Sequence, residues 1–246
     1  MTEAASPQTE EGANPLRTQV IDALSAVYDP ELDEPITALR FVSSCDVTAE
    51  GDVEVLLRLP TPQCAPNFAF LMASDARNAV GRLPAVRSVS VTLEDHYTGE
   101  EINAALRRGA GFTGAFPGET EDDDLEALRE LFTRKALVAR QSRLCEAMLS
   151  VGATAETVVA ARVSELPEGP ETRRCLQLRH QLGIASGPED PAFVLPSGEP
   201  LVADQLPRWR RGARLIRTSL EANGGICRAL LEVRHGLATE NEEVAR

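Results

Sequence analysis

The sequence lacks a run of apolar residues long enough to cross a membrane. No window approaches the roughly 18 uninterrupted apolar residues that a spanning helix needs. Residues 1–14 are polar and acidic, without the basic start and apolar centre of a secretory signal. We therefore expect a cytoplasmic protein that has no membrane partner.

The chain also has few basic residues for its length. Lys and Arg number 25 against 38 Asp and Glu, so the formal net charge is −13. Such a surface repels phosphate backbones and anionic lipid, which excludes nucleic acid as an expected partner. A strongly acidic partner is disfavoured for the same reason.

Cysteines are few and scattered, and no two of them form a Cys-x-x-Cys pair. An odd number of widely spaced cysteines argues against both a disulfide framework and a closed zinc site built by this chain alone. The five cysteines occupy positions 45, 64, 145, 175 and 227.

The length of 246 residues favours two domains of ordinary size. The first 13 residues offer little to bury, so we expect a disordered tail there. A glycine-rich stretch lacks the Gly-Lys-Ser/Thr ending of a phosphate loop, which indicates a linker. The expected segments are a tail (1–13), an α/β domain (14–108), a linker (109–120), a helical domain (121–237) and a second tail (238–246).

Hydrophobic periodicity divides the first domain into helices and strands. A helix capped at Asn14 and ending at Asp29-Pro30 precedes two alternating strands, which the turn at 49–52 joins into a hairpin. A helix then ends near Arg82, a third strand follows around 89–93, and a short helix closes the domain. A right-handed crossover places the third strand parallel to one member of the hairpin. The order α-β-β-α-β predicts a small two-layer domain.

Residues 125–235 show helical periodicity and predict an all-α bundle of about five helices. The fold class is therefore α+β, with the α/β domain first. We expect Asn223-Gly224-Gly225 to separate the last two helices. Arginines at 210, 211, 214 and 217 form one helix face, either a client-binding surface with Trp209 as its anchor or a solvated face.

Cys64 occupies a proline-stiffened loop directly before a predicted helix. The positive end of a helix dipole stabilises a thiolate there, and the thiolate is the form that binds metal or attacks electrophiles. The alternative is a small, partly buried residue that only ends a loop.

Two further features could serve a metal. Asp29, Glu31, Asp33 and Glu34 crowd one loop, which is either a solvated turn or the rim of a cation site. His96, at the end of the third strand, is either a second ligand beside Cys64 or a hydrogen-bonded loop histidine.

Residues 20–108 together resemble the MIP18/DUF59 family, which includes the PaaD-like and SufT-like iron–sulfur assembly factors. The resemblance depends on Asp29-Pro30-Glu31, on Ile36-Thr-Ala-Leu39, on the turn Pro62-Gln63-Cys64 before a helix, and on the segment from Leu83 to Val91. The helical domain matches no family in this way.

The resemblance implies a non-enzymatic maturation factor that inserts iron–sulfur clusters, or iron, into a client metalloenzyme. It assigns the cargo contact to Cys64 and matching acidic positions to Asp29 and Glu31. Because iron sites want about four ligands, the cargo would be held transiently and shared with a client, a carrier or a homodimer partner. By analogy alone, the client would be an oxygenase component such as a di-iron monooxygenase.

Two alternatives remain open. One is an adaptor or assembly chaperone in which Cys64 only packs. The other is a thiol-dependent enzyme with Cys64 as nucleophile and His96 as base, which requires a ring nitrogen about 3–4 Å from the sulfur.

Overall fold

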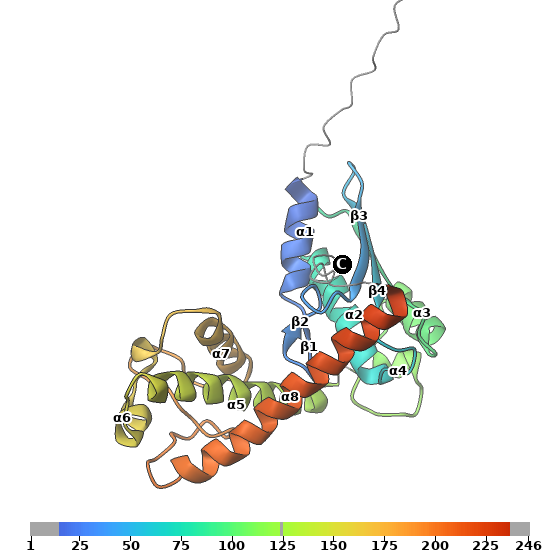
Figure 1. Ribbon diagram of the computed structural model, residues 1–246. Coiled ribbons are helices and arrows are strands. Elements are labelled where there is room, and N and C mark those ends of the chain that lie inside the picture. The colour runs from blue at the N-terminus through green and yellow to red at the C-terminus, as the bar shows by residue number, and fades with distance from the viewer. Residues whose placement is uncertain (1–14, 124, 237–246) are drawn as a thin grey trace, which may run out of the picture. The chain divides into compact units, whose positions relative to one another are not determined.

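The computed structural model describes residues 15–123 and 125–236 (Figure 1). These residues divide into two compact units. Unit 1 comprises 15–28 and 35–109, and unit 2 comprises 29–34 together with the described residues from 110 onward. The two expected tails and the Asn14 cap lie outside the described residues.

Unit 1 is an α/β domain with the expected order of elements. Its sheet runs β3-β4-β5, with β3 and β4 antiparallel and β4 and β5 parallel, as the hairpin and crossover predict. Its elements are α1 (Pro15–Ser25), β3 (Val42–Val47), β4 (Asp52–Arg58), α2 (Pro66–Gly81), β5 (Ser88–Glu94) and α3 (Gly99–Arg108).

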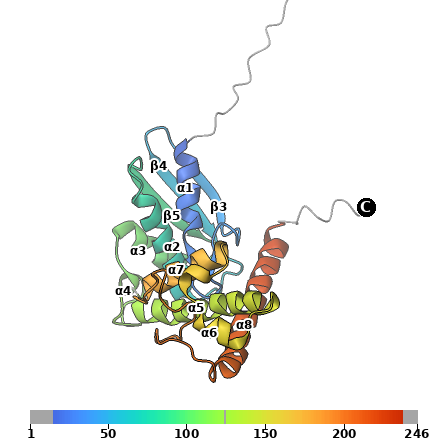
Figure 2. The ribbon, with the colours of Figure 1, turned by 90° about the vertical axis from the view of Figure 1, so that its left-hand side faces the viewer.

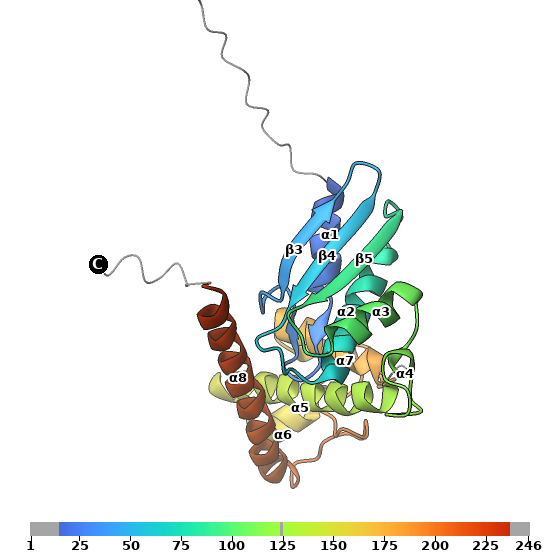
Figure 3. The same ribbon diagram turned by 90° about the vertical axis from the view of Figure 1, so that its right-hand side faces the viewer.

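Alternation along the central strand explains how the sheet faces its helices. Val53, Val55 and Leu57 are buried whereas Glu54 is exposed, because successive side chains of a strand point to opposite faces. Helix α1 lies in front of the strands in Figure 2 and behind them in the opposite view of Figure 3. Val20 and Leu24 of α1 are fully buried, so this helix covers one face of the sheet.

The segment 29–34 is enclosed by two very short strands. β1 (Tyr28–Asp29) pairs with β2 (Glu34–Pro35), and Asp33 at the turn has a left-handed φ of 51°. By its contacts this acidic segment belongs to unit 2.

The remainder of unit 2 is helical, which confirms the α+β class. Helix α5 packs against α7 and α8, and fully buried side chains such as Leu137, Cys145 and Leu178 form its core. The elements are α4 (Phe112–Ala115), α5 (Glu126–Ser150), α6 (Ala155–Ala160), a 3-10 turn (Val163–Glu165), α7 (Pro170–Gln181) and α8 (Leu206–His235). No helix within the described ranges is long and apolar enough to cross a membrane.

The predicted break at Asn223-Gly224-Gly225 is wrong, because α8 continues through it to His235. A glycine inside a helix costs only about 1 kcal/mol relative to alanine, and no proline is present to stop the helix. Gly224 is buried, and a Cβ atom there would lie 2.8 Å from Oε1 of Glu34. This glycine therefore permits a close approach and does not end the helix.

The interpretation of Trp209 as an exposed anchor also needs correction. Its ring packs against the core of unit 2, edge-on to Phe193 at a centroid distance of 6.5 Å. Arg210 on the same turn forms a bidentate pair with Glu146, both bonds being 3.0 Å long. Burying the large indole is worth more than exposing it, so the helix turns that face inward.

Candidate functional site

Cys64 lies in the turn between β4 and α2, one residue before the Ala65 N-cap. Its backbone N–H donates to Thr61 O at 3.3 Å, which closes the turn. Its Sγ lies 3.7 Å from Oγ1 of Thr61, and the residue is half-buried. The cysteine is thus only partly covered and lies at the start of a helix, where negative charge is favoured.

A second loop, at residues 95–98, holds this turn. Nε2 of His96 lies 2.8 Å from Cys64 O, while Nδ1 lies 3.3 Å from the backbone N of Thr98. Because Thr98 N–H donates to Nδ1, the ring proton sits on Nε2 and donates to the cysteine carbonyl. Tyr97 N–H adds a bond to Pro62 O at 3.0 Å. Two long-range hydrogen bonds therefore fix the cysteine turn.

The geometry gives His96 a specific role. Burial lowers the pKa of the imidazole, and the bond to Cys64 O acts in the opposite sense. Both ring nitrogens are engaged, one by the carbonyl of Cys64 and one by Thr98. A thiol enzyme would need a ring nitrogen that is free to act on the sulfur, whereas both nitrogens are engaged by other groups. As a metal ligand, His96 would have to release one of these two bonds.

Cys45, Cys145 and Cys175 are buried. Burial raises the pKa of Cys145 to about 11 and that of Cys175 to about 12, and it also raises the pKa of Cys45. These three thiols stay protonated at neutral pH and serve packing. Cys227, on α8, is half-buried.

Asp29 and Glu31 occupy one turn of the acidic segment. Oδ1 of Asp29 accepts bonds from the N–H groups of Glu31 and Leu32 at 2.8 and 3.0 Å. Burial nevertheless raises the pKa of Asp29 to about 6, the two backbone bonds acting in the opposite sense. Asp29 therefore shapes its own loop. Cys64 and His96 belong to unit 1, whereas Asp29 and Glu31 belong to unit 2.

The segment's most heavily bonded carboxylate is Asp33, which the sequence pattern marks only as one of four neighbouring acids. It is 3% exposed, and its two oxygens bind Arg140 and Arg174 at 2.6 and 2.7 Å. Arg140 also donates to Asp33 O at 2.6 Å. The left-handed turn and the buried position mark Asp33 as a structural anchor. The sequence alone shows that Asp33 lies among acidic neighbours, but it does not show the two arginines that bind it.

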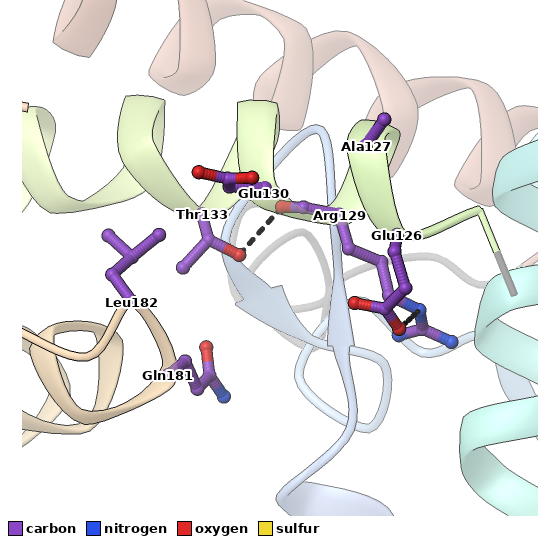
Figure 4. A pocket seen from close by; sticks show the side chains of 7 residues that line it. All are labelled: Glu126, Ala127, Arg129, Glu130, Thr133, Gln181 and Leu182. Atoms are coloured by element: carbon purple, nitrogen blue, oxygen red, sulfur yellow. Dashed lines mark hydrogen bonds and ion pairs between the residues drawn. The ribbon is translucent and has the colours of Figure 1, made fainter.

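Across residues 15–123 and 125–236, no three His, Cys, Asp or Glu side chains form a group that could hold a metal ion. Unit 2 has an open groove of about 650 Å³ between the start of α5 and the end of α7. Figure 4 shows the side chains that line this groove. Its polar lining includes Glu126, Glu130 and Gln181. Nε of Arg129 lies 3.9 Å from Oε1 of Glu126. Cys64 does not line this groove.

Comparison with known proteins shows which family the first part of the chain matches. Residues 17–93 match the family described as iron–sulfur cluster assembly protein, a stretch that contains Cys64, Asp29 and Glu31. An uncharacterized protein of Methanocaldococcus jannaschii is 33% identical over 91 residues, which cover 37% of this chain and 94% of that protein.

A second relative is the iron–sulfur cluster carrier protein of Mycobacterium leprae. It is 31% identical over 87 residues, or 35% of this chain, and the chain spans only 22% of that relative's length. Both matches are shorter than half of the present chain. Through residues 17–93, the chain belongs to the iron–sulfur cluster assembly protein family.

Proposed function

We propose that this chain is a non-enzymatic maturation factor that carries an iron–sulfur cluster, or iron, through Cys64 to a client metalloenzyme. The observation that carries the proposal is the half-buried position of Cys64 at the start of α2, inside the family-matched stretch. The name of the Mycobacterium leprae relative, a cluster carrier, supports the same cargo.

The chemistry of the site suits a cargo that is passed on. Clusters are held by about four thiolates, and Cys64 supplies one. The other ligands would come from the client, from an upstream carrier or from a second copy of this chain. A cargo with one ligand from the factor can leave by ligand exchange, which is what delivery requires.

The acidic pair takes a secondary place in this proposal. The carboxylate of Asp29 is committed to its own loop, whereas Glu31 is half-buried and its side chain has no hydrogen bond within the described residues. We assign Asp29 the role of shaping the segment, and Glu31 that of a hard oxygen ligand available to incoming iron.

Unit 2 would recognise the client. We propose an oxygenase component as that client, a di-iron monooxygenase being the specific case, and this step rests on analogy. Arg208, Arg211 and Arg214 are exposed and make no hydrogen bond or ion pair in the part of the chain described. Guanidinium groups of this kind suit carboxylates on a partner.

Anaerobic reconstitution with iron and sulfide tests the proposal. Native mass spectrometry and absorbance should show a bound cluster in the wild type. In Cys64→Ser, the amount of bound cluster should fall by at least about tenfold. Cys227→Ser is the matched control, because Cys227 is the other half-buried cysteine. Equal loading of wild type and Cys64→Ser would overturn the proposal.

A client assay separates the remaining functions. If Cys64→Ser activates the client as well as the wild type does, the adaptor function replaces metal handling. The thiol-enzyme function requires the His96 ring to act on the sulfur, yet Nε2 contacts Cys64 O at 2.8 Å.

A further inference from the structure

Unit 1 has an open groove between the last turns of α2 and the start of β5. The groove has a volume of about 620 Å³, and Cys64 does not line it. Its lining includes Arg77, Arg82 and Arg87, and within the described part of the chain it includes no carboxylate. Because the chain as a whole carries a net charge of −13, a groove with this lining differs in charge from the rest of the molecule.

Two of these arginines are not neutralised by a neighbouring carboxylate. Asp52 accepts hydrogen bonds from the guanidinium of Arg87, so that pair adds little net charge. The guanidinium groups of Arg77 and Arg82 form no hydrogen bond or ion pair with any other described residue. The last carbonyl groups of α2 carry about half an elementary negative charge, which the two arginines exceed. The groove therefore attracts an anionic group.

Strand β5 forms one edge of its sheet (Figure 3). Toward the end of the strand, Asn103 accepts a hydrogen bond from Leu93 N–H at 2.8 Å and donates one to Leu93 O at 3.0 Å. Because the backbone groups of a strand point alternately to its two sides, those of Val89 and Val91 also point away from β4. Val91 is only 4% exposed, whereas Val89 is half-buried and lines the groove. The edge is therefore open where the groove lies.

We propose that this groove binds an extended, acidic segment of a partner protein. The backbone of the segment bonds to the N–H and C=O of Val89, as an added strand does at a sheet edge. Its Asp or Glu side chains pair with Arg77 and Arg82, since guanidinium groups match carboxylates in charge and geometry. Because alternate side chains of a strand point the same way, carboxylates at every second position meet the arginines together.

The lining favours a peptide over a small phosphate ligand. Val89 offers one backbone donor and one backbone acceptor, which a peptide backbone satisfies together. A phosphate ion presents mainly acceptor oxygens at neutral pH, so it leaves the carbonyl of Val89 without a partner. Val86 and Val89 are half-buried, so they also offer apolar surface to a side chain of the segment. This inference is independent of the cargo proposed for Cys64, and the unloaded protein tests it.

Fluorescence polarisation of a labelled probe peptide, added to the full chain, measures the binding. The probe is a short peptide of alternating Glu and Val. Its control carries Gln in place of each Glu and should bind at least about tenfold more weakly. Arg82→Glu should weaken binding of the probe by at least about tenfold. Arg107→Glu is the matched control variant, because Arg107 is an exposed arginine of α3 outside the groove and its reversal changes the net charge equally.

Amide exchange measured by NMR tests the contact with the strand edge. The bound probe should slow exchange at Val89 by at least about fivefold and leave Leu93 unchanged, because Leu93 N–H is already bonded to Asn103. The proposal is overturned if the probe shows no binding up to about 1 mM, if Arg82→Glu and Arg107→Glu weaken binding equally, or if exchange at Val89 stays unchanged.

Two further outcomes assign the groove to another occupant and also overturn the proposal. The first is displacement of the probe by inorganic phosphate at an equal concentration, which would make the groove a site for small anions. The second is binding of the probe only after residues 1–13 are removed, which would assign the groove to the acidic residues at the start of this chain.

Discussion

Removing the carboxylate of Asp33 should destabilise unit 2 more than almost any other single polar change. The side chains of Asp33, Arg140 and Arg174 are 3%, 14% and 11% exposed, so their charges are largely withdrawn from water. Burial opposes the charge on Arg140, yet Asp33 and Glu171 outweigh it and raise the pKa of that guanidinium. The buried charges of the two arginines are therefore fully compensated only while the carboxylate of Asp33 is present.

The expected magnitude follows from what each arginine retains. Deleting one partner of a buried ion pair typically costs about 3–5 kcal/mol, because the remaining charge is left desolvated. In Asp33→Ala, Arg140 keeps Glu171 at 2.9 Å, while Arg174 loses both bonds to Oδ1. We therefore expect a loss in the lower part of that range, about 3 kcal/mol.

Urea unfolding followed by tryptophan fluorescence provides the assay. Trp209 is the only tryptophan in the chain and packs on the core of unit 2, so its emission reports this unit. Asp204→Ala is the control, since Asp204 is exposed and has no hydrogen bond among the described residues. A loss below about 1 kcal/mol in Asp33→Ala would refute the reasoning.

Three further predictions concern stability and the cysteine turn. Gly225→Ala should stabilise α8 by up to about 1 kcal/mol, since a Cβ atom there meets nothing within 4 Å. Gly224→Ala should stabilise the helix less, or destabilise it, because its Cβ atom would crowd Glu34. Urea unfolding compares the two variants. Hydrogen bonds from Arg87 and Ser88 lower the pKa of Asp52 from 3.8 to about 2. The Asp52 carboxylate therefore contributes to folding stability above about pH 4, and this contribution is lost as the pH falls through about 2. Asp52→Asn should flatten the acid-unfolding curve in this window. His96→Ala should cost about 1 kcal/mol and speed amide exchange at Cys64 and Tyr97, and unchanged exchange would contradict the role of the ring.

Local patterns were enough to predict most of unit 1. Alternation along residues 53–59 and the turn at 49–52 specify the hairpin, and the crossover rule then makes β5 parallel to β4. The proline-stiffened turn before α2 likewise placed Cys64 at a helix start. These features depend on neighbours a few residues apart, which a sequence displays directly.

What the sequence could not predict depends on distant partners. Asp33 meets Arg140 and Arg174 across 107 and 141 residues, and His96 meets Cys64 O across 32. No periodicity encodes such pairs. The continuity of α8 through Gly224 and Gly225 also depends on packing, because local propensity alone favours a break there.

Residue-specific alkylation before and after cluster loading tests the central claim most directly. The protein is reconstituted anaerobically, treated with an alkylating reagent and digested, and the modification of each cysteine is read by mass spectrometry. We predict that loading protects Cys64 while the modification of Cys227 stays unchanged. Equal alkylation of Cys64 in the loaded and unloaded protein would contradict its role as the cargo ligand.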